Sequence, residues 1–375
     1  MTENSKKHVD ACRFCWMCRH ICPIGNATGL ERNTARARAL NLSLVNRDVF
    51  GLEEVADNLY ECACCGACTG ECVTGWDPVM FTKEARLDAA MNDVLPSYIN
   101  TLLDNCLETG NAYGLAQLPA ETEEEQALVE AIRAHAPKES ADGKALLLFL
   151  GVDARYKMPG AAVSAIRALE KCGVTFTVLE QEPASGQQLE YLIGAANETK
   201  EQMNACAQVL NDYAKIVVYD PQDAKVFKRE YKEWGVELQA EVVTFTAFLA
   251  ALSEQGALPA AAAQAEGVTA VYQDPFQLAR DLGETEEGRK VAAAFVPLKE
   301  MLYYGKNTIW AGNLLMKEWM PQVIEQVAAN RIRNAKNVGA QMLVTASVSE
   351  YASLKAVAQT DVKIVSLEEL VLGCE

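Results

Sequence analysis

Two cysteine-rich stretches near the N-terminus fix the architecture of this chain: CRFCWMCRHICP at residues 12–23 and ECACCGACTGEC at residues 61–72. The first stretch places four cysteines in the spacing C-x2-C-x2-C-x3-C and ends on Pro23. The second repeats the same cysteine intervals, with Val73 in the position of the proline. The eight cysteines in these positions are Cys12, Cys15, Cys18, Cys22, Cys62, Cys65, Cys68 and Cys72. Two copies of one motif imply two sites of the same kind.

The spacing predicts iron-sulfur chemistry. A [4Fe-4S] cubane needs four thiolates that converge on four iron atoms, and C-x2-C-x2-C wraps three of them around one corner. The fourth thiolate must come from elsewhere, and in two-cluster ferredoxins the last cysteine of each run ligates the other cluster. We therefore expect two [4Fe-4S] clusters. The expected ligands are Cys12, Cys15, Cys18 and Cys72 for the first cluster, and Cys62, Cys65, Cys68 and Cys22 for the second.

The cysteines also leave alternatives open. Zinc binds four cysteines too, but its structural sites normally pair two C-x2-4-C knuckles, unlike the triple runs of this chain. Cys64 breaks the spacing of the second run, and it is either a bystander thiol beside the ligands or a residue that alters the ligation. The other four cysteines are scattered, and such cysteines are more often small buried hydrophobic residues than ligands. They are Cys106, Cys172, Cys206 and Cys374.

Composition and charge narrow the class of protein. A chain of 375 residues, 50% of them hydrophobic, has enough core for two or three domains. Its formal charge of -17 would repel a phosphate backbone, so nucleic acid is not an expected partner. No segment approaches the ~20 consecutive apolar residues of a membrane span, and the start of the chain has no apolar signal core. We expect a cytoplasmic protein without a membrane span, in which clustered cysteines serve metal or redox chemistry.

The segment between the two cysteine runs has a helical pattern. Its 39 residues suit one helix near residues 35–44 and another near residues 55–59. Arg32, Arg36 and Arg38 either offset the negative charge of a nearby cluster or lie on a solvated helical face. This domain is therefore expected to be mostly helical.

Beyond the second run the pattern becomes mixed. Pro78 begins a long helical pattern, and a loop-like acidic region with ETEEE at residues 121–125 follows as a linker that ends near residue 142. Strands and helices then alternate in two halves, separated by an alanine-rich stretch at residues 256–267, as in a repeat of parallel α/β units. Strands are expected at residues 145–152, 174–180, 215–220, 268–273, 341–347 and 362–367, and helices at 161–171, 198–213, around 291 and at 322–338.

The two cysteine stretches, the helical insert and the following helix resemble the helical two-cluster ferredoxin domain of the heterodisulfide reductase and glycolate oxidase iron-sulfur subunit family. That family continues with two repeats of a cysteine-rich CCG domain, each an α/β unit, and the layout of this chain is similar. The resemblance implies an α+β multidomain fold. It has an all-α two-cluster ferredoxin domain at residues 1–112, a linker at 113–142, and CCG-like α/β domains with parallel sheets at 143–256 and 257–375.

The resemblance has one gap, in the C-terminal half. Other residues stand where the family places the cysteines of its CCG domains, and hydroxyl, phenol and phenyl groups cannot replace thiolates as soft iron ligands. The substituted positions are Ala184 and Ser185, Asp223, Phe276, Tyr303 and Tyr304, and Ser347 and Glu350. We expect this half to hold no cluster and to act as a docking body.

These features imply an electron-transfer subunit of an oxidoreductase complex, without catalytic residues of its own. The resemblance implies an FAD-containing dehydrogenase partner, similar to that of glycolate or lactate oxidases, which delivers single electrons to one cluster. The other cluster passes them to a further acceptor protein. One alternative is an interaction, assembly or redox-sensing protein with structural clusters, and a weaker one is a disulfide or quinone reductase.

The sequence contains none of the common catalytic or nucleotide-binding motifs. The chain has no P-loop, dinucleotide-binding fingerprint, nucleophile elbow or H-E-x-x-H sequence. His20, inside the first run, either hydrogen-bonds a cluster or lies on the surface. Because exposed clusters degrade in oxygen, we expect an anaerobic or facultative source.

Overall fold

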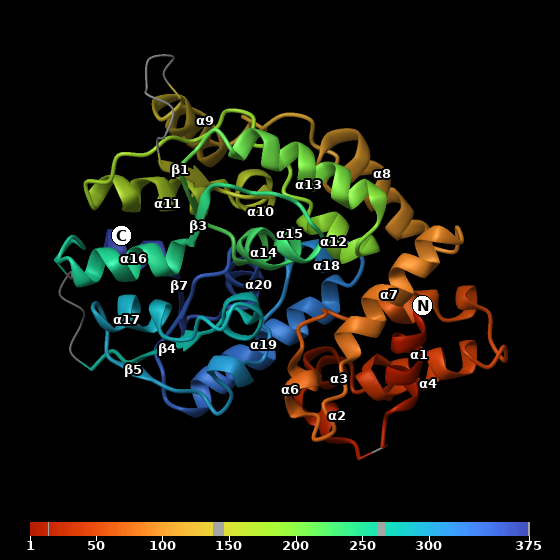
Figure 1. The fold of residues 1–375 in the computed structure, drawn as a ribbon. Coiled ribbons are helices and arrows are strands. Elements are labelled where there is room, and N and C mark those ends of the chain that lie inside the picture. Colours follow the sequence, from red (N-terminus) through yellow and green to blue (C-terminus); the bar gives the residue numbers. More distant parts are fainter. Residues whose placement is uncertain (14, 138–145, 261–266, 374–375) are drawn as a thin grey trace.

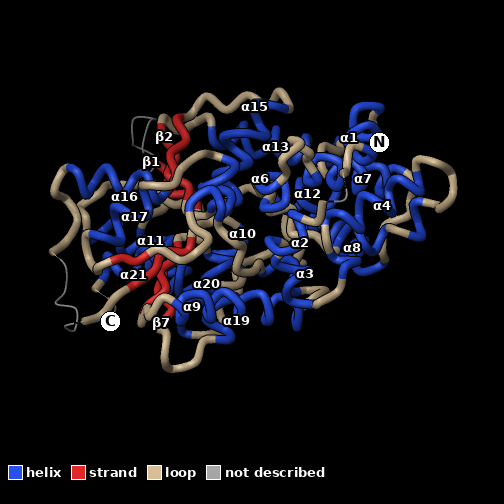
Figure 2. The backbone as a smooth tube through the Cα atoms, turned by 90° about the horizontal axis from the view of Figure 1, so that it is seen from below, coloured by secondary structure: helices blue, strands red, loops and turns tan. Residues whose placement is uncertain are grey.

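The computed structural model describes residues 1–13, 15–137, 146–260 and 267–373. A helical domain carries the N-terminus and both cysteine runs, and an α/β body carries the C-terminal end on the far side of the molecule (Figure 1). Seen from below, the short strands lie inside the α/β body with helices around them (Figure 2). The predicted α+β class is confirmed, with a helical front and parallel sheets behind it.

The helical domain contains short helices in the cysteine runs and longer helices between and after them. α4 (Ala35–Val45) and α5 (Ala56–Tyr60) lie between the runs, as predicted. α7 (Pro78–Met91) begins at the predicted proline, which suits a first turn whose N–H groups have no helical partner, and Asp77 caps two of those N–H groups. The remaining elements are α1 (Glu3–Asp10), α2 (Met17–Ile21), α3 (Pro23–Thr28), η1 (Glu31–Asn33), η2 (Leu52–Glu54), α6 (Ala67–Glu71) and α8 (Ser97–Thr109).

The first α/β unit holds a parallel sheet in the strand order β1-β2-β3. Leu147 of β1 pairs with Ile216 of β2, and both side chains are fully buried, which suits strands covered on both faces. The elements are β1 (Leu146–Phe149), α10 (Val152–Tyr156), α11 (Pro159–Lys171), α12 (Gln187–Ile193), α13 (Asn197–Leu210), β2 (Lys215–Val218), α14 (Pro221–Lys225), the π-helix η3 (Val226–Glu230), α15 (Tyr231–Glu233), β3 (Glu241–Thr244) and α16 (Phe245–Glu254).

The second α/β unit holds a parallel sheet in the order β5-β4-β6-β7. Its long helix, α19 (Pro321–Asn337), reaches the helical domain and packs against α3 (Figure 1). The other elements are β4 (Ala270–Gln273), the π-helix η4 (Gln277–Asp281), α17 (Glu287–Ala293), β5 (Leu298–Lys299), η5 (Gly305–Asn307), α18 (Leu314–Lys317), β6 (Met342–Thr345), α20 (Val348–Val357), β7 (Lys363–Ser366) and α21 (Leu367–Leu372).

The two α/β units share one hydrophobic core. Leu148 and Val217 of the first sheet belong to the same buried cluster as Tyr272 and Val344 of the second sheet. α11 packs against α21, and α16 packs against α17. The units therefore form a single body behind the helical domain.

One predicted strand is almost absent. Of residues 174–180, only Thr177 pairs with β1, as an isolated bridge to Leu147. The N–H group of Val178, which faces away from β1, donates to the carbonyl oxygen of His135 at 2.9 Å. A segment with good strand propensity thus makes a single bridge to the described part of the sheet.

The segment predicted as a linker contains a helix. α9 (Glu123–Ala134) begins with a capping box, in which the Glu125 N–H donates to Thr122 Oγ1 at 3.2 Å and the Thr122 N–H donates to Glu125 Oε2 at 2.9 Å. α9 packs against α11, so ETEEE starts a helix and does not form a loop. The predicted end of the linker near residue 142, the alanine-rich residues 261–266 and Cys374 lie outside the described residues.

A buried acid between the two α/β units makes stability depend on pH. Glu368 accepts a hydrogen bond from the hydroxyl group of Tyr219, and burial raises the pKa of Glu368 to about 7. An acid with a raised pKa stabilises the fold at low pH, and this contribution is lost as the pH rises from the unfolded value of ~4.3 to about 7. We expect Glu368→Gln to be more stable than the wild type at pH 8, with an advantage about 2 kcal/mol smaller at about pH 5.5.

Urea midpoints measured anaerobically at both pH values check this, with the exposed Glu325→Gln as the matched control. An advantage of the same size at both pH values would show that Glu368 is ionised throughout.

Candidate iron-sulfur site

Both cysteine runs fold into the same loop and short helix. α2 begins after Trp16 and α6 begins after Gly66, and these two residues have positive φ angles of 69° and 72°. Glycine adopts this left-handed conformation freely, whereas it is uncommon for tryptophan. The last cysteine of each run, Cys22 or Cys72, ends its helix in an extended conformation. α2 packs against α6, which brings the two runs side by side.

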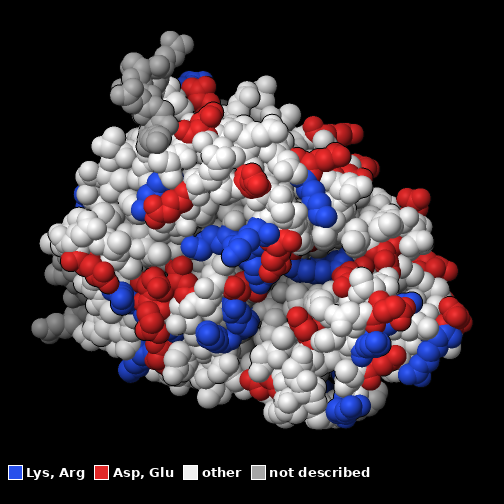
Figure 3. Space-filling model, viewed as in Figure 1, with Lys and Arg blue, Asp and Glu red and all other residues white. Residues whose placement is uncertain are grey.

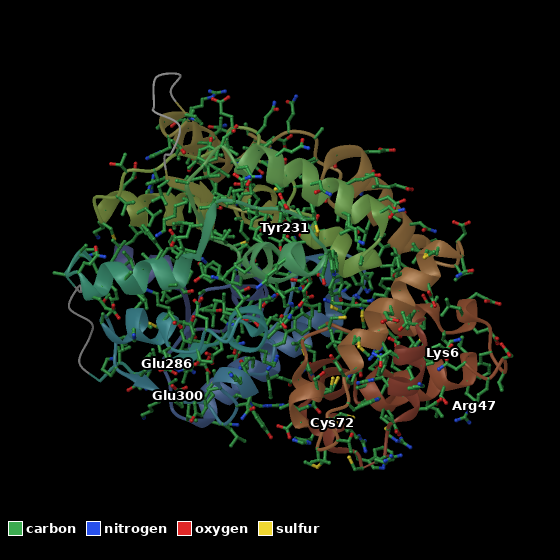
Figure 4. The ribbon with its side chains drawn as sticks, viewed as in Figure 1. Lys6, Arg47, Cys72, Tyr231, Glu286 and Glu300 are labelled. Carbon is green, nitrogen blue, oxygen red and sulfur yellow. The ribbon has the colours of Figure 1, made fainter. Side chains whose placement is uncertain are left out.

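A small cavity, here called the first cysteine hollow, lies at the surface of the helical domain. It is lined by three cysteines of the first run and one of the second, Cys12, Cys15, Cys18 and Cys72. The side chains of Trp16 and Met17 on its rim are 41% and 40% exposed, and Cys15 is exposed as well. Figure 4 shows Cys72 in the helical domain, far from Tyr231 in the α/β body. This hollow therefore opens to solvent.

A second cavity, the second cysteine hollow, lies deeper. It is lined by Cys62, Cys65, Cys68 and, from the first run, Cys22. Burial raises the pKa of the Cys22 thiol to about 12, and burial together with the neighbouring thiols raises the pKa of Cys68. Four buried thiols this close can all ionise only when positive charge lies among them, and iron supplies such charge. The donor set fits a cluster in chemistry as well as in number.

The structure thus brings together the two sets of four cysteines that the spacing predicts, including the exchange of the fourth cysteine between the runs. Within the described residues, no three His, Cys, Asp or Glu side chains converge on a point that could hold a single metal ion. Each set of thiols surrounds a hollow instead.

Three arginines surround the second hollow. Arg38 lines it, is 1% exposed, and keeps its Nη2 without a hydrogen-bond partner among the described residues. Arg86 donates to the carbonyl oxygen of Cys62 at 2.8 Å, and Arg280 donates to that of Cys65 at 2.7 Å. These cations would offset the negative charge of a cluster with four thiolates.

The three arginines that follow the first run, and His20 within it, lie in different environments. Arg38 lies inside, whereas Arg32 is exposed and pairs with Glu61 at 2.6 Å. Arg36 lines the first hollow and lies 3.9 Å from the centre of the Trp16 ring. His20 is on the surface, 3.9 Å from a carboxylate oxygen of Glu71.

The α/β body holds the second cysteine run in place. The Tyr191 hydroxyl donates to the carbonyl oxygen of Cys62 at 2.6 Å, and Trp319 Nε1 donates to that of Tyr60 at 3.2 Å. These two residues, like Arg86 and Arg280, were not predicted from the sequence. No local pattern marks them, because their partners are separated from them by 24 to 259 positions in the chain.

Cys64 belongs to neither hollow. It has a positive φ of 49° and lines a separate cleft between the helical domain and the α/β body. A side-chain hydrogen bond between the two thiols lowers the pKa of Cys62 and raises that of Cys64. Of the scattered cysteines, Cys106 and Cys206 are buried, as expected, and Cys172 is half-buried.

The positions that lack the family's cysteines form hydrogen-bonded networks. In the first α/β unit, the Ser185 hydroxyl bonds to the Asp223 carboxylate, and the Tyr231 hydroxyl donates to the carbonyl oxygen of Ser185 at 3.0 Å. Cys206 lies beside this network, and its sulfur is 3.8 Å from the carbonyl oxygen of Pro183. A single thiol does not fit a cubane.

The second α/β unit has a similar network. The Gly305 N–H donates to Asp274 Oδ2 at 2.7 Å, and Gln273 Nε2 donates to Glu350 at 3.2 Å. Arg331 Nη2 donates to the carbonyl oxygen of Tyr303 at 2.7 Å. Arg331 and Gln273 thus connect Tyr303 to Glu350, and amides, carboxylates and an arginine do not fit a cluster there.

None of the helices in the described part of the chain combines the length and the apolar character that crossing a bilayer requires.

The similarities to known proteins agree with this site. Residues 8–76, which include all eight cysteines of the two runs, match the profile of the 4Fe-4S dicluster domain. The chain is 24% identical to one subunit of the dihydromethanophenazine:CoB--CoM heterodisulfide reductase of Methanosarcina acetivorans, over 92% of this chain and 88% of that protein. The identity to the corresponding subunit of Methanosarcina mazei is also 24%, over 92% of this chain and 87% of that protein. A probable membrane-anchored ferredoxin of Chromohalobacter salexigens is 28% identical over 68% of this chain and 38% of that protein.

Separate substitutions of two adjacent cysteines test which of them is a ligand in the second hollow. Cys65→Ala is expected to lose about four iron atoms, because Cys65 lines the second hollow, whereas Cys64→Ala should keep them. Anaerobic iron quantitation on both variants checks this. Iron loss from Cys64→Ala alone would mean that Cys64 is the ligand.

Proposed function

We propose that this chain passes single electrons between two protein partners through [4Fe-4S] clusters, and its similarity to a heterodisulfide reductase subunit and to the 4Fe-4S dicluster domain supports this. The observation that carries the proposal is the pair of hollows, each lined by three cysteines of one run and one of the other. This is the arrangement of a two-cluster ferredoxin. Adjacent clusters exchange electrons in one-electron steps.

We propose two clusters with the exchanged ligand sets. The first would be held by Cys12, Cys15, Cys18 and Cys72, and the second by Cys62, Cys65, Cys68 and Cys22. Backbone N–H groups support this assignment, since the Gly25 N–H points at Cys22 Sγ over 3.4 Å and the Cys64 N–H points at Cys62 Sγ over the same distance. Hydrogen bonds to cluster sulfurs and burial raise or lower reduction potentials, so the two sites should differ in potential.

The exposure of the first hollow supports a partner that exchanges electrons there. The first hollow opens beside Trp16, Met17 and Arg19, of which the arginine lies 5.6 Å from the tryptophan ring. Aromatic residues, methionine and arginine are enriched at protein interfaces. A protein partner would therefore exchange electrons at the first cluster, while the second cluster faces the α/β body.

For the partner we propose an FAD-containing dehydrogenase subunit, with a second acceptor protein completing the path. The helical domain, residues 1–112, would carry the clusters, and the two α/β units at 143–256 and 257–375 would position it against these partners in the cytoplasm. The relatives from Methanosarcina are named for heterodisulfide reduction. This chain has hydroxyl, carboxylate and aromatic residues at the cysteine positions of the α/β units, which favours a relay over disulfide chemistry there.

Loss of the first cluster tests the relay. We expect Cys15→Ser to lose the first cluster and keep the α/β body folded, so that reduction of the second cluster by a photoreduced flavodoxin slows by at least ~10-fold. Stopped-flow absorbance under anaerobic conditions measures the rate, and Cys172→Ser, a thiol outside both runs, is the control. An unchanged rate in Cys15→Ser would show that electrons bypass the first cluster. If flavodoxin cannot reduce the clusters of the wild type, the clusters have a structural role.

A further inference from the structure

A cleft of about 830 Å³ separates the helical domain from the α/β body. Its walls come from the second cysteine run and α7 on one side, and from α12, α14 to α15 and the η4 to η5 region on the other. Figure 3 shows lysine and arginine side chains gathered along the hollow between these parts, with acidic side chains among them. Pockets for small molecules have volumes of roughly 300–1,000 Å³, and this cleft lies within that range.

The cleft lies directly against the second cysteine hollow. Gly66 and Val79 line both cavities, so one residue layer separates them. The glycine has no side chain to thicken this wall, and Cys64 faces the cleft beside it. A molecule in the cleft would therefore lie within electrostatic reach of a cluster in the second hollow.

Three acidic residues of the cleft lining form ion pairs with lysine or arginine. Glu190 forms ion pairs with Lys83 and with Lys225, the latter at 3.0 Å. Arg229 pairs with Glu230 and with Asp281, both at 2.6 Å. The lining contains three further acidic residues, Asp77, Glu84 and Glu233, of which Asp77 caps the first turn of α7 and Glu84 accepts a hydrogen bond from the Thr2 N–H.

Two cations beside the second run have no acidic partner among the described residues. Arg280 donates to the carbonyl oxygens of Cys65, Lys306 and Thr308, and its buried Nη2 has no hydrogen-bond partner in the described part of the chain. Lys306 is exposed and forms no ion pair with a described residue. Because carbonyl oxygens do not cancel a full charge, Arg280 and Lys306 place two positive charges without a carboxylate ion-pair partner among the described residues beside the second run.

The cleft also holds an unused buried acceptor. Glu230 is 2% exposed and lines the cleft, and its Oε2 has no hydrogen-bond partner among the described residues while Oε1 takes the ion pairs. A buried polar atom without a partner costs free energy unless a ligand or water satisfies it. Among the described residues, the cleft therefore offers donors without a partner on Arg280 and Lys306, and an acceptor without a partner, Glu230 Oε2.

We infer that this cleft binds a small organic anion, with a carboxylate or phosphate group on Arg280 and Lys306 and a hydrogen-bond donor on Glu230. The inference rests on the proposed function, because it gives the second cluster a ligand whose binding depends on the redox state of that cluster. An anion next to the cluster disfavours the added electron, so binding lowers the reduction potential of the second cluster and leaves that of the solvent-facing first cluster unchanged. Reduction of the cluster weakens binding in return.

The test is an anaerobic redox titration of the full chain, followed by EPR, with inorganic phosphate and with succinate as separate probes at constant ionic strength. We expect one of the two clusters to shift to lower potential, saturably, with at least one probe. Phosphate alone would identify a phosphate site, and succinate alone a carboxylate site. Arg280→Gln should weaken the apparent affinity by roughly 10-fold or more, which is the loss expected for a charge-assisted hydrogen bond.

Since Arg280 also supports the cysteine run, Lys306→Gln is the second variant, and Lys232→Gln, an exposed residue outside the cleft, is the control. The inference is overturned if neither probe gives a saturable shift, or if Lys306→Gln binds the probe as the control does. These outcomes are distinct from failure of the relay, in which the clusters would be absent or could not be reduced.

Discussion

The exchange of the fourth cysteine between the two runs is the constraint on which the rest of the structure depends. Cys22 lies with the second run and Cys72 lies with the first, so neither set of four thiols is complete without both runs. The runs are separated by 39 residues, and α4 and α5 must fold between them to bring α2 and α6 together. Thiols that are costly to ionise in this buried place become favourable ligands once iron is present.

The environment of the second hollow explains why the α/β body remains attached to the helical domain. Two carbonyl oxygens of the second run are hydrogen-bonded by Arg86 and Arg280, and one of these arginines comes from the C-terminal half. Hydrogen bonds from charged donors are about twice as strong as neutral ones, and a buried cation here offsets cluster charge. The body that lacks the family's thiols thus still determines the electrostatics of the cluster in front of it.

The sequence predicts the elements that follow from local chemistry. Cysteine spacing, Pro78 and alternating hydrophobic runs locate the cysteine hollows, α7 and most strands within a few residues. The acidic tract around Glu125 was expected to be a loop, although its T-x-x-E pattern is a capping box that begins α9. Residues 174–180 have the composition of a strand, but they make only the Thr177 bridge to β1, while the Val178 N–H on the opposite edge donates to the carbonyl oxygen of His135.

The residues that position the site could not be predicted in this way. Arg280 lies 215 positions from Cys65, and Trp319 lies 259 positions from Tyr60, so only the tertiary fold brings them together. The same is true of the cleft, whose ion pairs join α7 to α12 and η3 across the boundary between the helical domain and the α/β body. Cysteine spacing predicts the cluster ligands. The arginines that would change the reduction potential of a cluster reach these ligands only through the tertiary fold.

Anaerobic quantitation of iron and acid-labile sulfide, with an EPR spectrum of the dithionite-reduced protein, tests the central claim most directly. The account predicts about eight iron and eight sulfide per chain, and a spectrum broadened by two neighbouring reduced cubanes. Zinc without sulfide would contradict it outright. Iron well above eight would place a further centre in the α/β body, against the hydrogen-bonded networks that occupy the family's cysteine positions there.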